Sequence, residues 1–473
     1  MSEKFSDLLN LVSRAAESIG SVGDRRLLLI SHYDADGLAA ASILVSTLSR
    51  LGFALQLVVV EQLTPTTLRS LGRLIGGYPL TLLTDLGSGA LKALERIGTR
   101  IIVLDHHLPE GETTSIIEVN PHRVGIDGSR DVSSSGLAYL LSRELLSEKA
   151  LKLAPLAVVG ALGDRQDVGR RFRLIGINRL IVDEAVKYNL LKEGVGLRIM
   201  GGARRPLVKA LAYTTDPFIP GITGDEGAAL AFLSNIGIRA SKNGEPRTLG
   251  DLSREERKKL ASELVKHMIG SGYPVSEAER IYGATYTILA EPEGSPLRDA
   301  REYAQLLNAN GRMGYYALAV ALGLGIRGEV LAKALEAAGQ YRALLSKVFR
   351  HLREEKLVRE GKWYVLIDLT EKEFVTERIS GAIASLTTPS LARGKLVIVA
   401  VRSPEGVKIS LRKGRRGPKQ VNVGALLKRV AGAVGGRGGG HENAGGASIP
   451  AEKLGELLDL IDQEVGRIAG SGG

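Results

Sequence analysis

The sequence predicts an α/β protein with a parallel sheet in its first part, a helical middle region and a smaller α/β domain towards the C-terminal end. Short apolar runs, typical of buried strands, alternate with stretches of helical hydrophobic spacing. The runs cover residues 27–30, 55–60, 80–84 and 101–104, and the helical stretches cover 5–19, 38–51 and 90–97. This alternation of strand and helix favours a parallel sheet that is covered on both faces.

The pattern changes twice further along the chain. From about Val195 it is mostly helical, and strand-like runs bounded by Gly and Pro return at 363–369, 395–401 and 407–411. At 473 residues the chain also exceeds the size of one ordinary domain. We therefore expect an α/β domain at 1–194, a helical connecting region at 195–360 and a smaller α/β domain at 361–473.

Composition excludes several classes of protein. The chain is 44% hydrophobic and 24% charged, which is ordinary for a folded domain, and its longest weakly polar run, 314–326, is too short to span a bilayer. The first residues lack the pattern of a signal peptide, so a cytoplasmic location without membrane contact is expected. Without cysteine, any metal must be held by Asp, Glu and His.

Positive charge is concentrated in one stretch. Lys and Arg number 63 against 52 Asp and Glu, and eleven of the basic residues lie between 395 and 437, where Glu405 is the only acid. This asymmetry is expected of a surface that binds nucleic acid, because each neutralised phosphate releases a counterion. A basic face that is merely solvated is the alternative.

Polar residues follow the candidate strands where those strands end. They are His32, Asp34 and Asp36 after the first run, Asp85 after the third, Asp105, His106 and His107 after the fourth, and Asp164 after a further apolar run at 156–162. Open α/β sheets bind their ligands at the carboxyl ends of the strands. These oxygen and nitrogen donors suit two Mn²⁺ or Mg²⁺ ions that activate water against a phosphodiester. For Asp34 and Asp36 alone, a turn that caps the next helix is the alternative.

These motifs resemble the four ordered motifs of the DHH phosphoesterase superfamily, which has a parallel-sheet DHH domain. The segment 438–447, Gly-Gly-Gly-His-Glu-Asn-Ala-Gly-Gly-Ala, resembles the signature of the C-terminal DHH-associated domain. The segment 294–312 is similar to the archaeal RecJ-like exonucleases, including the GINS-associated nuclease type. It departs from that group at Asn310, where Cys is expected.

The resemblance implies a role for each residue of the motifs. Metal ligands would be His32, Asp34, Asp36, Asp85, His106 and Asp164, with Asp85 as the bridge between two ions. His107 would face the scissile phosphate, and Asp105 would orient the His pair. Asp167 is interpreted either as a residue behind the ligands or as a simple surface acid.

The C-terminal signature implies a phosphate-binding region. Glycines let backbone amides approach a phosphate closely, and basic side chains on the neighbouring strand supply positive charge. The residues of this region are Lys408, Arg412, Arg415, Arg416, Gly439, Gly440, His441, Gly445 and Gly446. A solvated loop remains the alternative for Arg415 and Arg416.

The expected function is a two-metal exonuclease that hydrolyses single-stranded DNA, or RNA, from an end during replication or repair. One strand would pass between the first domain and the basic C-terminal domain. A phosphodiesterase for oligoribonucleotides or cyclic dinucleotides is one alternative. The other is a replisome scaffold that binds GINS or the MCM helicase with little catalysis.

Overall fold

The computed structural model of the chain describes residues 2–201, 205–355, 357–404, 406–414, 416–440 and 442–470. They form two compact units, Met1–Arg205 with Tyr282–Gly339, and Pro206–Ile281 with Gln340–Gly473. Each unit is therefore assembled from two separate segments, and the expected region 195–360 contributes to both. Among the described residues, no helix is long and apolar enough to cross a membrane.

A five-stranded parallel sheet organises the first unit. Its strands are β1 (Arg26–His32), β2 (Ala54–Val60), β3 (Thr81–Thr84), β4 (Ile101–Leu104) and β5 (Ile117–Val119). Their order is β2-β1-β3-β4-β5, so the first strand of the chain lies inside the sheet. Because all neighbours are parallel, every strand ends at the same edge. The predicted strands are confirmed, and β5 was not predicted.

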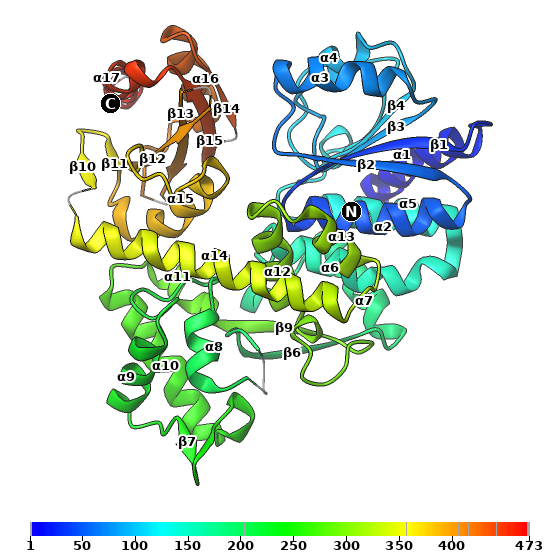
Figure 1. Cartoon of the computed structure of the whole chain (residues 1–473). Helices are drawn as coiled ribbons and strands as arrows, with labels where there is room; N and C mark the ends of the chain where they lie inside the picture. Colours follow the sequence, from blue (N-terminus) through cyan, green and yellow to red (C-terminus); the bar gives the residue numbers. More distant parts are fainter. Residues whose placement is uncertain are drawn as a thin grey trace. The chain divides into compact units, whose positions relative to one another are not determined.

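Helices cover both faces of this sheet (Figure 1). On one face lie α3 (Pro65–Gly76) and α4 (Leu91–Glu95), whose Leu71, Ile75, Leu91 and Leu94 share an apolar cluster with β1, β3 and β4. On the other lie α1 (Ser2–Gly20), α2 (Ala35–Arg50) and α5 (Ser134–Leu146). Further α-helices of the first unit are α6 (Ala154–Gly163), α7 (Gly176–Lys187), α12 (Ala300–Arg312) and α13 (Tyr316–Gly323).

Two features of the first unit differ from the sequence prediction. The apolar run at 156–162 forms the helix α6 rather than a strand, because a short run of this kind fits either structure. The expected helical region also contributes an antiparallel pair of strands, β6 (Leu191–Leu197) and β9 (Tyr282–Ile288). That pair joins the two sequence segments of the unit.

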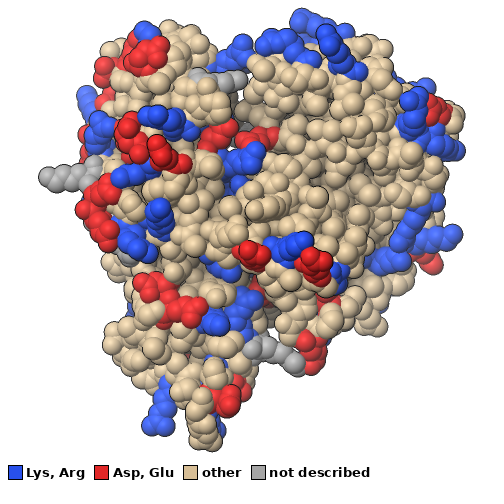
Figure 2. Space-filling model, viewed as in Figure 1, with Lys and Arg blue, Asp and Glu red and all other residues tan. Residues whose placement is uncertain are grey.

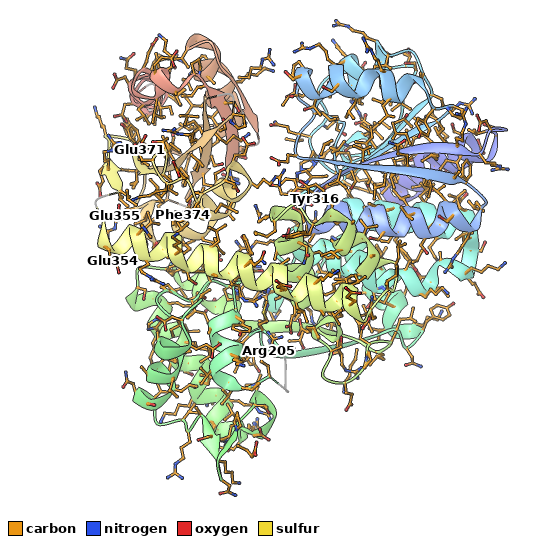
Figure 3. The ribbon with its side chains drawn as sticks, viewed as in Figure 1. Arg205, Tyr316, Glu354, Glu355, Glu371 and Phe374 are labelled. Carbon is orange, nitrogen blue, oxygen red and sulfur yellow. The ribbon has the colours of Figure 1, made fainter. Side chains whose placement is uncertain are left out.

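The second unit contains a helical part and a mixed sheet. The helical part comprises α8 (Leu207–Tyr213), α9 (Glu226–Asn235), α10 (Arg254–Gly270) and α11 (Val275–Ala278), with a small hairpin of β7 (Ser241–Lys242) and β8 (Glu245–Pro246). The long helix α14 (Glu329–Glu354) begins in the first unit and ends in the second. Its last turns meet the segment that follows β11: Glu355 pairs with Lys372, and Lys347 lies over the ring of Phe374 (Figure 3).

The C-terminal sheet has six strands in the order β10-β11-β12-β13-β15-β14. They are β10 (Val358–Glu360), β11 (Tyr364–Asp368), β12 (Leu396–Ser403), β13 (Gly406–Lys413), β14 (Arg437–Gly440) and β15 (Ala444–Ile449). The helices α16 (Val423–Ala433) and α17 (Leu454–Gly470) pack their apolar side chains on one face. The helix α15 (Glu377–Leu391) contacts β12 and β13.

Candidate metal centre

The loop between β1 and α2 carries the first group of polar residues. Asp34 caps α2, since its Oδ1 accepts from Gly37 N at 3.0 Å, while its Oδ2 lies 3.1 Å from His32 Nδ1. The capping interpretation and the ligand interpretation of Asp34 are therefore compatible. The loop is tightly wound, because a Cβ on Gly37 would lie 2.5 Å from the His32 carbonyl oxygen.

Asp85 lies at the centre of the site. It follows β3 with a left-handed backbone (φ 61°), a conformation that Asp tolerates better than most residues. Its Oδ2 is 3.2 Å from His32 Nδ1, and its Oδ1 is 3.3 Å from His106 Nε2. The Asp85 side chain is 2% exposed. One buried carboxylate therefore faces both the imidazole at the end of β1 and the imidazole that follows β4.

The two histidines that follow β4 are oriented by different partners. His106 Nδ1 lies 2.7 Å from the Gly128 carbonyl oxygen, which only accepts, so this nitrogen carries the proton and Nε2 faces the carboxylates. His107 Nδ1 lies 2.7 Å from Asp105 Oδ1, the contact expected of a residue that orients it. Asn120 donates to the His107 carbonyl oxygen at 2.8 Å, behind the His pair.

Asp36 is held by the start of α5. Its carboxylate accepts from Ser134 N at 2.7 Å and from Ser135 N at 3.1 Å, and Ser135 Oγ also donates to it. The N-terminus of a helix stabilises negative charge, which explains how a carboxylate that is 1% exposed is accommodated. Ser133 caps α5, and Ser134 Oγ donates to Asp85 Oδ1 at 3.1 Å.

Asp164 follows α6, and its Oδ2 lies 3.6 Å from His106 Nε2. Gln166, fully buried, donates to the same Oδ2 at 2.9 Å and to the Gly128 carbonyl oxygen at 2.9 Å. Asn178 in turn donates to Gln166 Oε1 at 2.7 Å, which fixes the orientation of the amide. Sequence reasoning missed Gln166 and Asn178, because neither residue type signals a ligand partner. Asp167 is fully buried and ion-paired with Arg301, so it is not a surface acid.

The electrostatics of the site reflect many carboxylates in a small buried volume. Burial and the charge of Asp85 raise the pKa of Asp36 to about 7. Burial lowers the pKa of His32, but the adjacent carboxylates of Asp34 and Asp85 outweigh it, so the pKa is raised well above its usual value. Buried carboxylates this close need compensating positive charge.

A divalent cation would supply that charge. Two groups of residues could each hold an ion. One is His32, Asp34 and Asp85, and the other is Asp85, His106 and His107; within each group the donor atoms all lie within 4.8 Å of one another. Carboxylate oxygens and imidazole nitrogens are suitable ligands for Mn²⁺ or Mg²⁺, so the donor set fits these ions. Asp85 belongs to both groups. Asp36 and Asp164 belong to neither, although Asp164 approaches His106.

The predicted phosphate-binding residues lie on adjacent strands of the C-terminal sheet. Lys408 and Arg412 are on β13, and Arg412 pairs in register with Ala444 on β15. Gly445 and Gly446 on β15 pair with Gly440 and Gly439 on β14. We call Lys408, Arg412, Gly439, Gly440, Gly445 and Gly446 the glycine-strand region. Arg416 lies in the turn after β13, and Arg415 and His441 lie outside the described residues.

The basic excess of this domain is partly neutralised by folding. Four basic residues of the stretch 395–437 pair with acids from outside it: Lys395 with Glu360, Arg402 with Glu371, Lys413 with Glu442 and Arg429 with Glu464. Figure 2 accordingly shows acidic and basic side chains intermingled on the visible face of this domain. Arg412 donates to Ser385 Oγ at 3.1 Å and to the Leu411 carbonyl oxygen.

Three domain families match the chain. The N-terminal domain of the DHH family matches residues 26–161, the DHH-CID domain matches 199–282 and the DHHA1 domain matches 364–467. Together they cover more than half of the sequence, and the first contains every predicted metal ligand except Asp164.

Two relatives extend this comparison. An uncharacterised protein of Methanocaldococcus jannaschii is 29% identical over 481 residues, with 98% of this chain and 99% of that protein aligned. The single-stranded-DNA-specific exonuclease RecJ of Thermus thermophilus is 26% identical over 288 residues, which cover 58% of this chain and 40% of RecJ. The chain therefore spans less than half of that characterised relative.

Solved structures share the fold. Exonuclease RecJ bound to manganese is 17% identical, with a TM-score of 0.58 over 98% of this chain and 96% of that one. CDC45 from Entamoeba histolytica is 12% identical, with a TM-score of 0.64 over 98% of this chain and 99% of that one.

Proposed function

Because this chain belongs to the DHH superfamily of metal-dependent phosphoesterases and is RecJ-like, we propose that it is an exonuclease that hydrolyses single-stranded DNA from an end. The observation that carries the proposal is the pair of donor groups that share Asp85 at one edge of a parallel sheet. RNA is an alternative substrate of the same chemistry. We place the activity in the cytoplasm, in DNA replication or repair.

The proposed cofactor is a pair of Mn²⁺ or Mg²⁺ ions. His32 and Asp34 would hold one ion, His106 and Asp164 the other, and Asp85 would contact both, with Asp36 beside them. When bound, two such ions lower the pKa of water and stabilise charge on the attacking and leaving oxygens of a phosphodiester. Burial opposes the charge on His107, but Asp105 beside Nδ1 outweighs it and raises the pKa of the ring, so that in the protonated form the other ring nitrogen can donate to the scissile phosphate.

The glycine-strand region is proposed to hold the sugar-phosphate backbone. Arg412 offers a guanidinium to a phosphate, and Gly439, Gly440 and Gly446 on the paired strands β14 and β15 are at least partly exposed. Arg415, Arg416 and His441 belong to the same proposal. With 4% aromatic residues, base stacking is limited, and the contacts would be largely independent of base sequence.

A digestion assay tests the proposal. One single-stranded DNA is labelled separately at each end and incubated with Mn²⁺ and either the wild-type protein or the Asp34→Ala, Asp36→Ala double variant. We expect mononucleotide to appear early from one labelled end only, and the double variant to release none. Asp24→Ala, which removes an exposed acid of the same unit, is the matched control and should digest normally.

Two other outcomes would redirect the proposal. Cleavage of dinucleotides as fast as of long strands would favour a phosphodiesterase for oligoribonucleotides or cyclic dinucleotides. No release from either end would favour a replisome scaffold that binds GINS or MCM proteins, a role consistent with the fold shared with CDC45. Retained partner binding by the double variant would separate that role from hydrolysis.

A further inference from the structure

The helix α12 contacts the metal-binding loops, although no matched domain family covers its residues. It lies more than 260 residues after the β1–α2 loop in the chain, and the fold brings the two together in the first unit. The segment 294–312 contains this helix, and the proposed function assigns it no task. A role in positioning the metal ligands rests on that proposed function.

Asn308 supplies a hydrogen bond that the β1–α2 loop lacks by itself. The first backbone N–H groups of a helix have no partner within the helix. In α2, Asp34 Oδ1 accepts from Gly37 N, and Asn308 Oδ1 on α12 accepts from Ala35 N at 2.9 Å. Ala35 lies between Asp34 and Asp36, two proposed ligands. Asn308 therefore fixes the peptide that sets their spacing.

Gly311 brings α12 into direct contact with the same loop. A Cβ at this position would lie 1.9 Å from the Tyr33 carbonyl oxygen, a distance that no side chain permits. A Cβ on Gly163 of α6 would lie 2.5 Å from Ala35 Cβ, at the start of α2. Both α12 and α6 thus pack closely here through a glycine.

The same helix also reaches the second ligand-bearing segment. Arg301 donates to Asp167 Oδ2 at 2.7 Å, three residues beyond Asp164, and both side chains are buried. Glu302 pairs with Arg205, which Figure 3 labels at the end of the first segment of this unit. One helix therefore contacts the segments that carry Asp34, Asp36 and Asp164.

From these contacts we infer that α12 is a positioning element of the metal centre, and that Asn308 and Gly311 set the affinity of the protein for Mn²⁺. Neither residue belongs to the two groups of donor atoms. Loss of a partner behind the ligands typically weakens metal binding about 10–100-fold. We expect Asn308→Ala to raise the dissociation constant for Mn²⁺ by about tenfold. Gly311→Ala should raise it further, because the loop must move.

The test measures metal binding directly, without substrate. Mn²⁺ is titrated into the full chain and free Mn²⁺ is followed by electron paramagnetic resonance. Asn308→Asp keeps the acceptor oxygen at the same place and should restore affinity close to that of the wild type. Asn10→Ala, an exposed residue on α1, and Gly72→Ala, a helical glycine of α3 with nothing within 4 Å, are the matched controls.

Amide exchange without metal, in the wild-type protein and in Asn308→Ala, is the second measurement. The Ala35 amide should exchange slowly, and Asn308→Ala should accelerate its exchange more than that of the amides of α5. Equal Mn²⁺ affinity in Asn308→Ala and wild type, or an unprotected Ala35 amide, would overturn the inference. Failure of the wild-type protein to bind Mn²⁺ would instead overturn the proposed function.

Discussion

In the metal centre the central carboxylates are buried and held by fixed partners, whereas the basic side chains of the C-terminal domain lie nearer the surface, several of them beside carboxylates. Asp36 and Asp85 are almost inaccessible and accept from backbone or serine groups. Lys408 and Arg412 are only partly buried. A preorganised site places its donors for one geometry, while a surface that follows a flexible strand must adapt to many. Substitutions in the metal centre should therefore affect Mn²⁺ binding and hydrolysis strongly, whereas substitutions in the C-terminal domain should have smaller effects, on binding of the strand.

The largest effect is expected from Asp85→Asn. This change removes a charge from both donor groups while keeping the size of the side chain. Mn²⁺ binding and hydrolysis of single-stranded DNA should fall by more than about 100-fold, beyond the loss typical of a residue behind the ligands. Asp24→Asn is the control and should keep both properties. Normal Mn²⁺ affinity in Asp85→Asn would remove Asp85 from the centre.

A smaller effect is expected from Gln166→Glu, which tests the amide behind Asp164. The new carboxylate would face Asp164 Oδ2, which now accepts a hydrogen bond from Gln166. Loss of this hydrogen bond and repulsion between the two carboxylates should displace Asp164 from its ligand position and so raise the Mn²⁺ dissociation constant by about tenfold, measured by titration. Gln56→Glu, on β2 away from the donor groups, is the matched control. An unchanged constant would make Gln166 a packing residue only.

In the C-terminal domain, Arg412→Ala should weaken binding of single-stranded DNA equally for all base sequences. Loss of one phosphate contact should reduce the slope of log affinity against log salt by about 0.7. Arg402→Ala, whose side chain pairs with Glu371, should leave the slope unchanged. Fluorescence anisotropy at several salt concentrations measures both. A loss confined to some base sequences would argue for base contacts instead.

The smallest effect is expected from Glu302→Gln, on the pH dependence of the stability of the fold. Burial raises the pKa of Glu302 to about 7, so the folded state binds this proton more tightly than the unfolded state. The contribution of Glu302 to stability is therefore full below its ordinary pKa of 4.5 and is lost as pH rises to about 7. Glu302→Gln stays neutral, so its melting temperature relative to wild type should rise between pH 5 and pH 8. A constant difference would contradict the raised pKa.

Local patterns were enough to predict the strands and the residues at their ends. Apolar runs followed by His32, Asp85 and Asp105 indicate a shared sheet edge, because parallel strands end together. Asp164 was predicted to follow an apolar element, but that element is a helix. The strands β14 and β15 were missed, since glycine-rich segments have low strand propensity.

Contacts between distant parts of the chain were not predictable. Asn308 and Ala35 are 273 residues apart, and nothing near Asn308 in sequence indicates its partner. Likewise, the charge count for residues 395–437 could not anticipate that Glu360 and Glu464 would pair with Lys395 and Arg429. Residue types predict a kind of chemistry, whereas the partners that tune it depend on packing.

The most direct test of the central claim is the magnetic state of bound Mn²⁺. If Asp85 contacts two ions, the wild-type protein should bind two Mn²⁺ per chain, and their spins should couple, so the paramagnetic resonance spectrum should differ from that of an isolated ion. Asp85→Asn should lose this coupled spectrum. A wild-type spectrum of one isolated ion, or of two uncoupled ions, would contradict a shared centre at Asp85.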